Sequence, residues 1–123
     1  MVDYALKRRS RLHDYAAGRV SAAELCDAHP HLLLAARHYG EPAPQPCPIC
    51  KRETLQNVHY VYGDELGQMA GQAKSTGELR LLTTRFPRFT VYRVEVCTHC
   101  RWNHLSRSFV LSNEHRPPAA AGG

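Results

Sequence analysis

"CTHCRWNH", at residues 97–104, contains a pair of cysteines separated by two residues, and the organisation of the chain follows from this pair. An earlier stretch, "PCPICK" at residues 46–51, contains a second pair with the same spacing. Two intervening residues let one tight turn present both sulfurs to the same ion, and Zn²⁺ prefers four such ligands in a tetrahedron. The spacing therefore predicts one metal site with four ligands, Cys47, Cys50, Cys97 and Cys100.

The predicted site is structural rather than catalytic. A catalytic zinc ion usually keeps one position open for water, whereas four cysteines fill the tetrahedron. The chain has no H-E-x-x-H motif, and "PCPIC" matches only the second half of the deaminase signature, so we expect that the protein is not an enzyme. His99 or His104 would have to replace a cysteine in order to bind, and surface or sheet-face positions are favoured for both. Zinc is the expected ion, and iron, which would use the same four sulfurs, is the less favoured alternative.

The composition sets limits on the size, partners and location of the protein. The chain has 123 residues, enough for one domain with a modest core, and a formal net charge of +5. Four thiolates and one Zn²⁺ would lower that charge to about +3, which permits a nucleic-acid partner without requiring one. No apolar run approaches the roughly 18–20 residues of a membrane span, and the first residues lack the features of a signal peptide. We therefore expect a cytoplasmic protein with no membrane partner, whose five cysteines stay reduced and favour metal over disulfides.

Helical patterns occupy the first forty residues. "YALKRRSRLHDYAAG" predicts a helix over about residues 3–17. Ser21 and Glu24 in "VSAAEL" have the spacing of a capping box and predict a second helix over about residues 21–29. Pro30 ends that helix and suits the first position of a third one, over residues 30–39. The chain is thus expected to begin with a helical module, residues 1–40, followed by a proline-rich hinge, residues 41–46.

Alternating apolar residues predict three strands in the second half of the chain. They lie in "TLQNVHYVY" (54–62), "FTVYRVEV" (89–96) and "HLSRSFVL" (104–111). Between the first two strands, short helices are expected at residues 64–74 and 77–84. The last residues, 113–123, have no core-forming pattern and are expected to be a disordered tail.

The two cysteine turns bounded by strands resemble a zinc ribbon over about residues 45–112. We therefore expect an α+β fold, in which an N-terminal three-helix segment precedes a small three-stranded antiparallel zinc-ribbon sheet at residues 47–112. Glycine often follows the second cysteine of such turns, whereas Lys51 and Arg101 stand there in this chain. "GRVSAAELCDAHPHLLLAARHYG", the CPIC turn and "YRVEVCTHCRWNHL" together resemble a family of small uncharacterised actinobacterial zinc-ribbon proteins, and that resemblance implies a structural metal but no reaction.

Basic and aromatic residues are the candidates for contact with a partner. They are found on the first helix, on the second strand and beside the second cysteine pair: Lys7, Arg8, Arg11, Arg93, Arg101, Trp102 and His104. Cationic side chains of this kind can meet phosphates, and an indole ring can anchor an interface. The alternative is that the basic residues form a solvated polar face and that Trp102 shields the metal turn within a small core.

These features favour an adaptor over a factor that reads DNA sequence. The segment "HLLLAARHYG" would be the recognition helix of a helix-turn-helix unit, but it is too apolar for that role. By analogy with small ribbon proteins, we expect docking on a large nucleoprotein machine, RNA polymerase or the ribosome, without a small-molecule substrate. One alternative is a protein-interaction module without nucleic acid. Another is a redox-responsive zinc-thiolate protein in which Cys26 pairs with a zinc ligand, although a free cysteine more often packs in a core.

Overall fold

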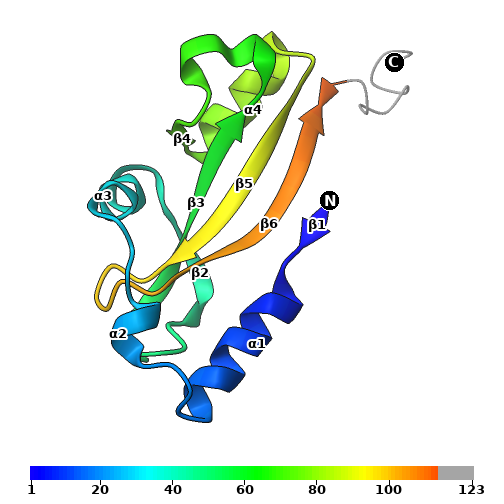
Figure 1. The fold of residues 1–123 in the computed structure, drawn as a ribbon. Coiled ribbons are helices and arrows are strands. Elements are labelled where there is room, and N and C mark those ends of the chain that lie inside the picture. Colours follow the sequence, from blue (N-terminus) through cyan, green and yellow to red (C-terminus); the bar gives the residue numbers. More distant parts are fainter. Residues whose placement is uncertain (114–123) are drawn as a thin grey trace.

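The chain forms an α+β fold around one antiparallel sheet with the strand order β1-β6-β5-β3-β2, and β4 also pairs with β3 (Figure 1). This computed structural model describes residues 1–113. The three long strands are β3 (Thr54–Tyr62), β5 (Arg88–Val96) and β6 (Asn103–Ser112). All three strands were predicted, because strict alternation of apolar and polar residues is a local signal that survives folding.

Three further strands make the expected architecture wrong. The sheet contains six strands instead of three, because β1 (Val2–Asp3), β2 (Glu41–Pro46) and β4 (Ala73–Lys74) add to it. Strand β1 precedes the helices and pairs with β6, so the chain does not consist of a three-helix segment followed by a separate sheet. The segment expected as a hinge, residues 41–46, is strand β2 at the sheet edge, where prolines are tolerated because one side of the strand has no partner.

The helices of the first forty residues are α1 (Ala5–Ala16), α2 (Ala22–Leu25) and α3 (Pro30–Tyr39). Helix α2 begins with the predicted capping box, and α3 begins at the predicted proline. Helix α2 is nevertheless only four residues long. It ends early because the following segment runs along the second cysteine turn, where the Ala28 amide donates to the Arg101 carbonyl oxygen over 3.0 Å.

The segment between β3 and β5 contains one predicted helix and one incorrect prediction. Helix α4 (Thr76–Arg85) confirms the helix expected at residues 77–84 and begins with a capping box. The helix expected over residues 64–74 is instead the 3₁₀ segment η1 (Asp64–Met69), which is followed by β4. Gly67 interrupts η1 with a φ of 58°, a left-handed conformation that no regular helix accepts.

Helices cover parts of both faces of the sheet. On one face, α1 packs near the cysteine turns, and α4 with η1 packs over the far end. On the other face, α3 covers Val58 and Val96. Figure 1 shows α1 and α3 on either side of the end of the sheet that carries the cysteine turns. Among the helices of residues 1–113, none therefore covers the middle of the first face or the far half of the second face.

The expected module boundaries fall within one continuous structure. Leu25 of α2 shares a core cluster with Leu55 of β3 and with Trp102, so the helices and the cysteine turns pack together. Except for Asn113, the tail expected at residues 113–123 lies outside the described residues. Within residues 1–113, no helix is both long enough and apolar enough to cross a membrane.

Candidate metal centre

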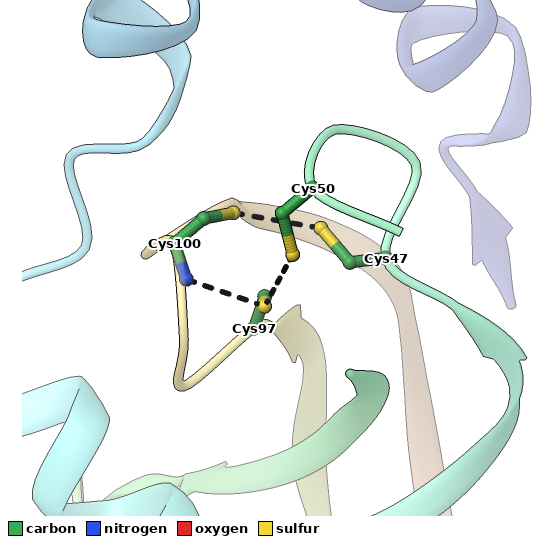
Figure 2. Close-up of side chains that lie close together, drawn as sticks. All are labelled: Cys47, Cys50, Cys97 and Cys100. Atoms are coloured by element: carbon green, nitrogen blue, oxygen red, sulfur yellow. Dashed lines mark hydrogen bonds between the residues drawn. The ribbon is translucent and has the colours of Figure 1, made fainter. Parts of the chain in front are cut away.

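The four predicted metal ligands converge on one point. The Sγ atoms of Cys47, Cys50, Cys97 and Cys100 all lie within 4.8 Å of one another, and Figure 2 shows them turned towards a common centre. The Cys47–Cys100 and Cys50–Cys97 sulfur distances are 3.5 Å and 3.7 Å. Four sulfurs at about 2.3 Å from a tetrahedral Zn²⁺ would lie about 3.8 Å apart. The cluster therefore fits a four-coordinate metal ion.

Each cysteine pair lies in a turn closed by the same backbone hydrogen bond. The Lys51 amide donates to the Cys47 carbonyl oxygen over 3.1 Å, and the Arg101 amide donates to the Cys97 carbonyl oxygen over 2.9 Å. Closing the turn forces a left-handed conformation on the donor, with φ values of 59° at Lys51 and 76° at Arg101. The two positions at which other turns of this kind often have glycine thus have the backbone geometry that glycine favours.

Backbone amides also point at the sulfurs. The Ile49 amide donates to Cys47 Sγ, and the Cys100 amide donates to Cys97 Sγ, both over 3.4 Å. Such hydrogen bonds favour the charged thiolate over the neutral thiol. The turns therefore prepare the sulfurs for a cation as well as orienting them.

Burial and hydrogen bonding act in opposite directions on the thiols. Burial raises the pKa of the Cys97 and Cys100 thiols, because a thiolate loses hydration there. Burial also opposes ionisation of Cys50, but hydrogen bonds from the backbone amides of Arg52 and Glu53, together with those from Cys97 and Cys47, outweigh it and lower the pKa of this thiol to about 7. Four thiolates this close together repel one another, so a bound cation is what would hold the whole set ionised.

A fifth cysteine lies against the cluster. Cys26, at the end of α2, places its Sγ 3.5 Å from Cys100 Sγ, as close as Cys47 is. Burial raises the pKa of the Cys26 thiol. The redox hypothesis for Cys26 required the helices to pack against the cysteine turns, and this contact meets that condition.

A buried carboxylate behind the second cysteine turn fixes helix α1 to the sheet. Glu95, 7% exposed, accepts from Arg8 Nε over 2.8 Å and from Trp102 Nε1 over 2.9 Å. Sequence analysis did not select Glu95. The available signal was an acidic residue on the strand directly before a cysteine pair, where an inward-facing charge needs partners.

Arg11 and His104 extend this network. The Arg11 guanidinium lies 4.7 Å from the centre of the Trp102 ring and donates to the Asn103 carbonyl oxygen over 2.9 Å. It also lies 2.9 Å from His104 Nδ1, and the His104 ring stacks on Trp102. Burial lowers the pKa of His104, which favours the neutral ring as an acceptor for Arg11.

The structure separates the predicted contact residues into two groups. Lys7 and Arg101 are exposed. The others make internal contacts: Arg8, Arg11, Trp102 and His104 hold α1 on the sheet, and Arg93 is half-buried and donates to Ser106 Oγ over 3.1 Å. Trp102 is fully buried, so its visible role is to pack beside the cysteine turn.

Comparison with known proteins identifies relatives but no activity. The model of DUF5318, a family of unknown function, matches residues 1–121. The uncharacterised protein Rv0049 of Mycobacterium tuberculosis is 48% identical over 124 residues, which cover 99% of this chain and 90% of that relative. The uncharacterised protein Mb0050 of Mycobacterium bovis matches with the same identity and coverage. No solved structure matches the chain.

Proposed function

The chain belongs to DUF5318, a family of unknown function, and on that premise we propose that the protein is a non-enzymatic zinc-binding adaptor. The observation that carries this proposal is the four-sulfur cluster, whose donors would all be used by one tetrahedral ion. Zinc is preferred over iron because it is the commoner ion in sites with two such cysteine turns. The role of the ion is to join the two turns and, through them, the core around Leu25 and Trp102.

The zinc assignment is tested by metal content. Protein purified without added metal should contain one zinc ion per chain, measured by plasma mass spectrometry. Cys47→Ser should lose most of that zinc, because the buried Cys47 supplies one of the four sulfurs. Cys26→Ser is the matched control, since it removes a neighbouring thiol but no proposed ligand, and it should retain the ion. Iron in place of zinc, or equal zinc in both variants, would contradict the assignment.

The absence of enzymatic activity is proposed from the donor set. A zinc ion held by four protein thiolates has no open position for water or substrate. On its inner side, where Cys47 and Cys97 are buried, the cluster packs against Leu25, Leu55 and Trp102, which are each at most 5% exposed. These features favour a structural ion over a reactive one.

An uncovered aromatic surface supports docking on a protein partner. Tyr60, Tyr62, Tyr92 and Val94 share one sheet face and line a hollow beyond the part that α3 covers. The Tyr62 and Tyr92 rings meet edge to face with their centroids 5.2 Å apart, and Tyr62 is 45% exposed. Tyrosine is enriched at protein interfaces because its ring is apolar and rigid and its hydroxyl can stay hydrated. We propose that this surface, which we call the tyrosine surface, docks on a protein of the transcription or translation machinery.

In this proposal, exposed basic residues make the contact with nucleic acid. Lys7 lies on the outer side of α1, and Lys51, Arg52 and Arg101 flank the cysteine turns. Because Arg8 and Arg11 already have internal partners, α1 offers fewer free cations than its sequence contains. Nucleic acid is accordingly an assisting contact rather than the principal one.

The adaptor role is tested by recovering partners from native lysate with tagged protein, with and without nuclease. Polymerase or ribosomal subunits should remain bound after nuclease and should be lost with Tyr62→Ser. Lys7→Ser is the control for general surface changes and should reduce recovery only in low salt. Loss of every partner on nuclease treatment would contradict protein docking. Recovery of an unrelated protein, insensitive to salt, would instead favour a protein-interaction module without nucleic acid, because phosphate contacts weaken with salt.

The contact between Cys26 and Cys100 favours a second candidate function, redox response. Hydrogen peroxide could oxidise these two thiols, 3.5 Å apart, to a disulfide. With zinc bound, the Cys26 thiol loses one electron and its proton, and the Cys100 thiolate loses one electron. The peroxide takes up both electrons, that proton and one from the solvent, and forms two water molecules. Loss of Cys100 from the donor set would then release zinc.

Zinc release during mild peroxide treatment tests this candidate. Wild-type protein should release zinc several-fold faster than Cys26→Ser, and mass spectrometry after blocking free thiols should identify a Cys26–Cys100 disulfide. Equal rates of release would eliminate the redox function while leaving the adaptor proposal intact.

A further inference from the structure

A polar pocket lies on the α1 face of the sheet, beside the first turn of α1. Its volume is about 430 Å³, within the range of small-molecule sites in proteins. It lies between β1, the start of α1, strand β2 and the three long strands. Its charged and uncharged polar lining residues come from five different strands and one helix: Asp3, Arg8, Gln45, Asn57, Arg93, Glu95, Ser106 and Arg107.

Two arginines form the floor of this pocket as direct neighbours. Arg93 of β5 and Arg107 of β6 are cross-strand partners, so the sheet holds their side chains on the same face. Like charges placed opposite each other destabilise a strand pair. Burial, and next the charge of Arg107, lower the pKa of the Arg93 guanidinium, which nevertheless stays protonated. The pair therefore stores repulsion that an anion between the two side chains would relieve.

The carboxylates in the pocket leave this charge unbalanced. Glu95 is occupied by Arg8 and Trp102. Asp3 lies 3.9 Å from Arg107 Nε, a long contact, and its other oxygen accepts from the Ala5 amide over 2.8 Å. Arg93 has no carboxylate within 4.0 Å among the described residues, which leaves the pocket with three guanidinium groups against two carboxylates.

Arg93 is held in position by Ser106 and keeps unused hydrogen-bond donors on its guanidinium group. The β5–β6 register shifts between Arg93 and Val94, and Ser106 of β6 lies at this shift, between the residues that pair with them. Ser106 Oγ accepts from Arg93 Nε over 3.1 Å and donates to the Arg93 carbonyl oxygen over 3.0 Å. This leaves the two terminal nitrogens of Arg93 without a partner in residues 1–113. The side-chain amide of Asn57, another lining group, likewise has no hydrogen bond within the described chain.

We propose that this pocket binds the phosphate group of a small ligand between Arg93 and Arg107. Guanidinium groups match phosphate well because their parallel N–H donors meet two oxygens at once. The first turn of α1, which also lines the pocket, adds the positive end of a helix dipole. The remaining volume, next to Gln45 and Leu55, would take the organic part of the ligand. This site contains none of the proposed metal ligands, and its proposal does not rest on the adaptor role.

The proposal is tested by titrating the ¹⁵N-labelled, zinc-loaded full chain with inorganic phosphate and with pyrophosphate at constant ionic strength. The Arg Nε–H resonances and the backbone amides around Arg93 and Arg107 should shift to saturation. Arg93→Gln should weaken binding at least tenfold, because it removes a fixed charge and its free donors. Arg93→Lys should restore part of the affinity. Arg52→Gln, an exposed arginine beside the first cysteine turn, is the control and should bind like wild type.

Several results would overturn the proposal. One is the absence of saturable shifts with either probe, and another is equal binding of acetate, which would exclude specificity for phosphate. A single-stranded oligonucleotide that shifts the same resonances when inorganic phosphate and pyrophosphate do not would mean that the pocket meets a nucleic-acid backbone instead. If Arg93→Gln does not fold, as judged by its spectrum and zinc content, Arg107→Gln replaces it, since that side chain is 41% exposed.

Discussion

Lys51 and Arg101 illustrate how single residues carry the cost of the metal site. Both adopt a left-handed backbone directly after the second cysteine of their turn. A side chain in this conformation places its β-carbon against the following carbonyl oxygen, at a cost of about 1–2 kcal/mol. The hydrogen bond that closes each turn requires the conformation all the same. The positive charges of these two side chains follow the cysteines directly in the chain and favour the thiolate form of the ligands.

Glycine at such a position should therefore stabilise the fold. We expect Lys51→Gly to raise the free energy of unfolding of the zinc-loaded protein by about 0.5–1 kcal/mol, with part of the relieved strain offset by the greater entropy of the unfolded chain. Urea unfolding measures this change. The adjacent Arg52→Gly is the matched control and should be neutral or destabilising, because Arg52 is not in the left-handed region. Equal destabilisation by both changes would refute the strain argument.

His59 is a second residue whose environment predicts a measurable effect. Its Nδ1 atom is buried and has no hydrogen-bond partner among residues 1–113, and burial lowers the pKa of the ring. The charged neighbours are Lys74 on β4, Arg93 on β5 and Glu41 on β2. Since the folded pKa is depressed, the stability associated with this histidine is present above about pH 6.5 and is lost as the pH falls towards the folded pKa.

Replacing His59 should remove that dependence. Between pH 7.5 and pH 5.5, the free energy of unfolding of His59→Phe should fall less steeply than that of wild type, as measured by urea unfolding at each pH. His13→Phe, an exposed position on α1, is the matched control. Parallel curves for wild type and His59→Phe would show that the unfolded chain gains no extra proton at this site.

At the scale of elements, α1 is held to the sheet by polar contacts and by Leu12 and Tyr15, which pack against the core around the cysteine turns. None of its residues is buried, yet Arg8 and Arg11 reach the buried Glu95 and Trp102. A few directional contacts therefore add to a narrow, partly buried apolar side in positioning this helix. The contacts explain why the most basic segment of the chain is not simply a free basic surface.

The ion pair between Arg8 and Glu95 should couple strongly. Arg8→Met leaves a buried carboxylate without its cation, because Glu95 is only 7% exposed. The substitution should lower the free energy of unfolding by about 2 kcal/mol. When Glu95 is already replaced by Gln, Arg8→Met should lower the free energy of unfolding by clearly less. A double-mutant cycle by urea unfolding measures the difference. Additive effects would mean that α1 is held by other contacts.

At the scale of the whole molecule, the core is divided along the sheet. One cluster surrounds the cysteine turns and contains Leu25, Leu55 and Trp102. Another lies under α4 and contains Leu82 and Phe89. The two clusters flank the polar pocket, so the metal ion supports directly only the end of the molecule that contains it.

Removal of the metal should therefore unfold one end first. After treatment with a strong chelator, hydrogen exchange measured by mass spectrometry should rise by at least tenfold in α1, α2 and both cysteine turns, while α4 and the adjoining parts of β3 and β5 stay protected. Adding zinc should restore protection. A uniform rise across the whole chain would show that the metal supports the fold globally.

The sequence by itself determined the features that depend on neighbouring residues. The three long strands follow from alternation, the capping box of α2 follows from Ser21 and Glu24, and the cysteine turns follow from their spacing. The convergence of four sulfurs was predictable as well. Each cysteine turn supplies two sulfurs, and one tetrahedral ion needs the four that the two turns supply together.

Only the tertiary structure decided the six-stranded sheet, the place of Cys26 and the partners of Arg8 and Arg11. Strands β1 and β4 have two residues each, too short for any periodic pattern, and the prolines of β2 favour a linker by local rules. These segments become strands because the edges of β6 and β3 offer unpaired hydrogen-bonding groups. Such groups exist only once the sheet has formed, which is why local sequence contains no record of them.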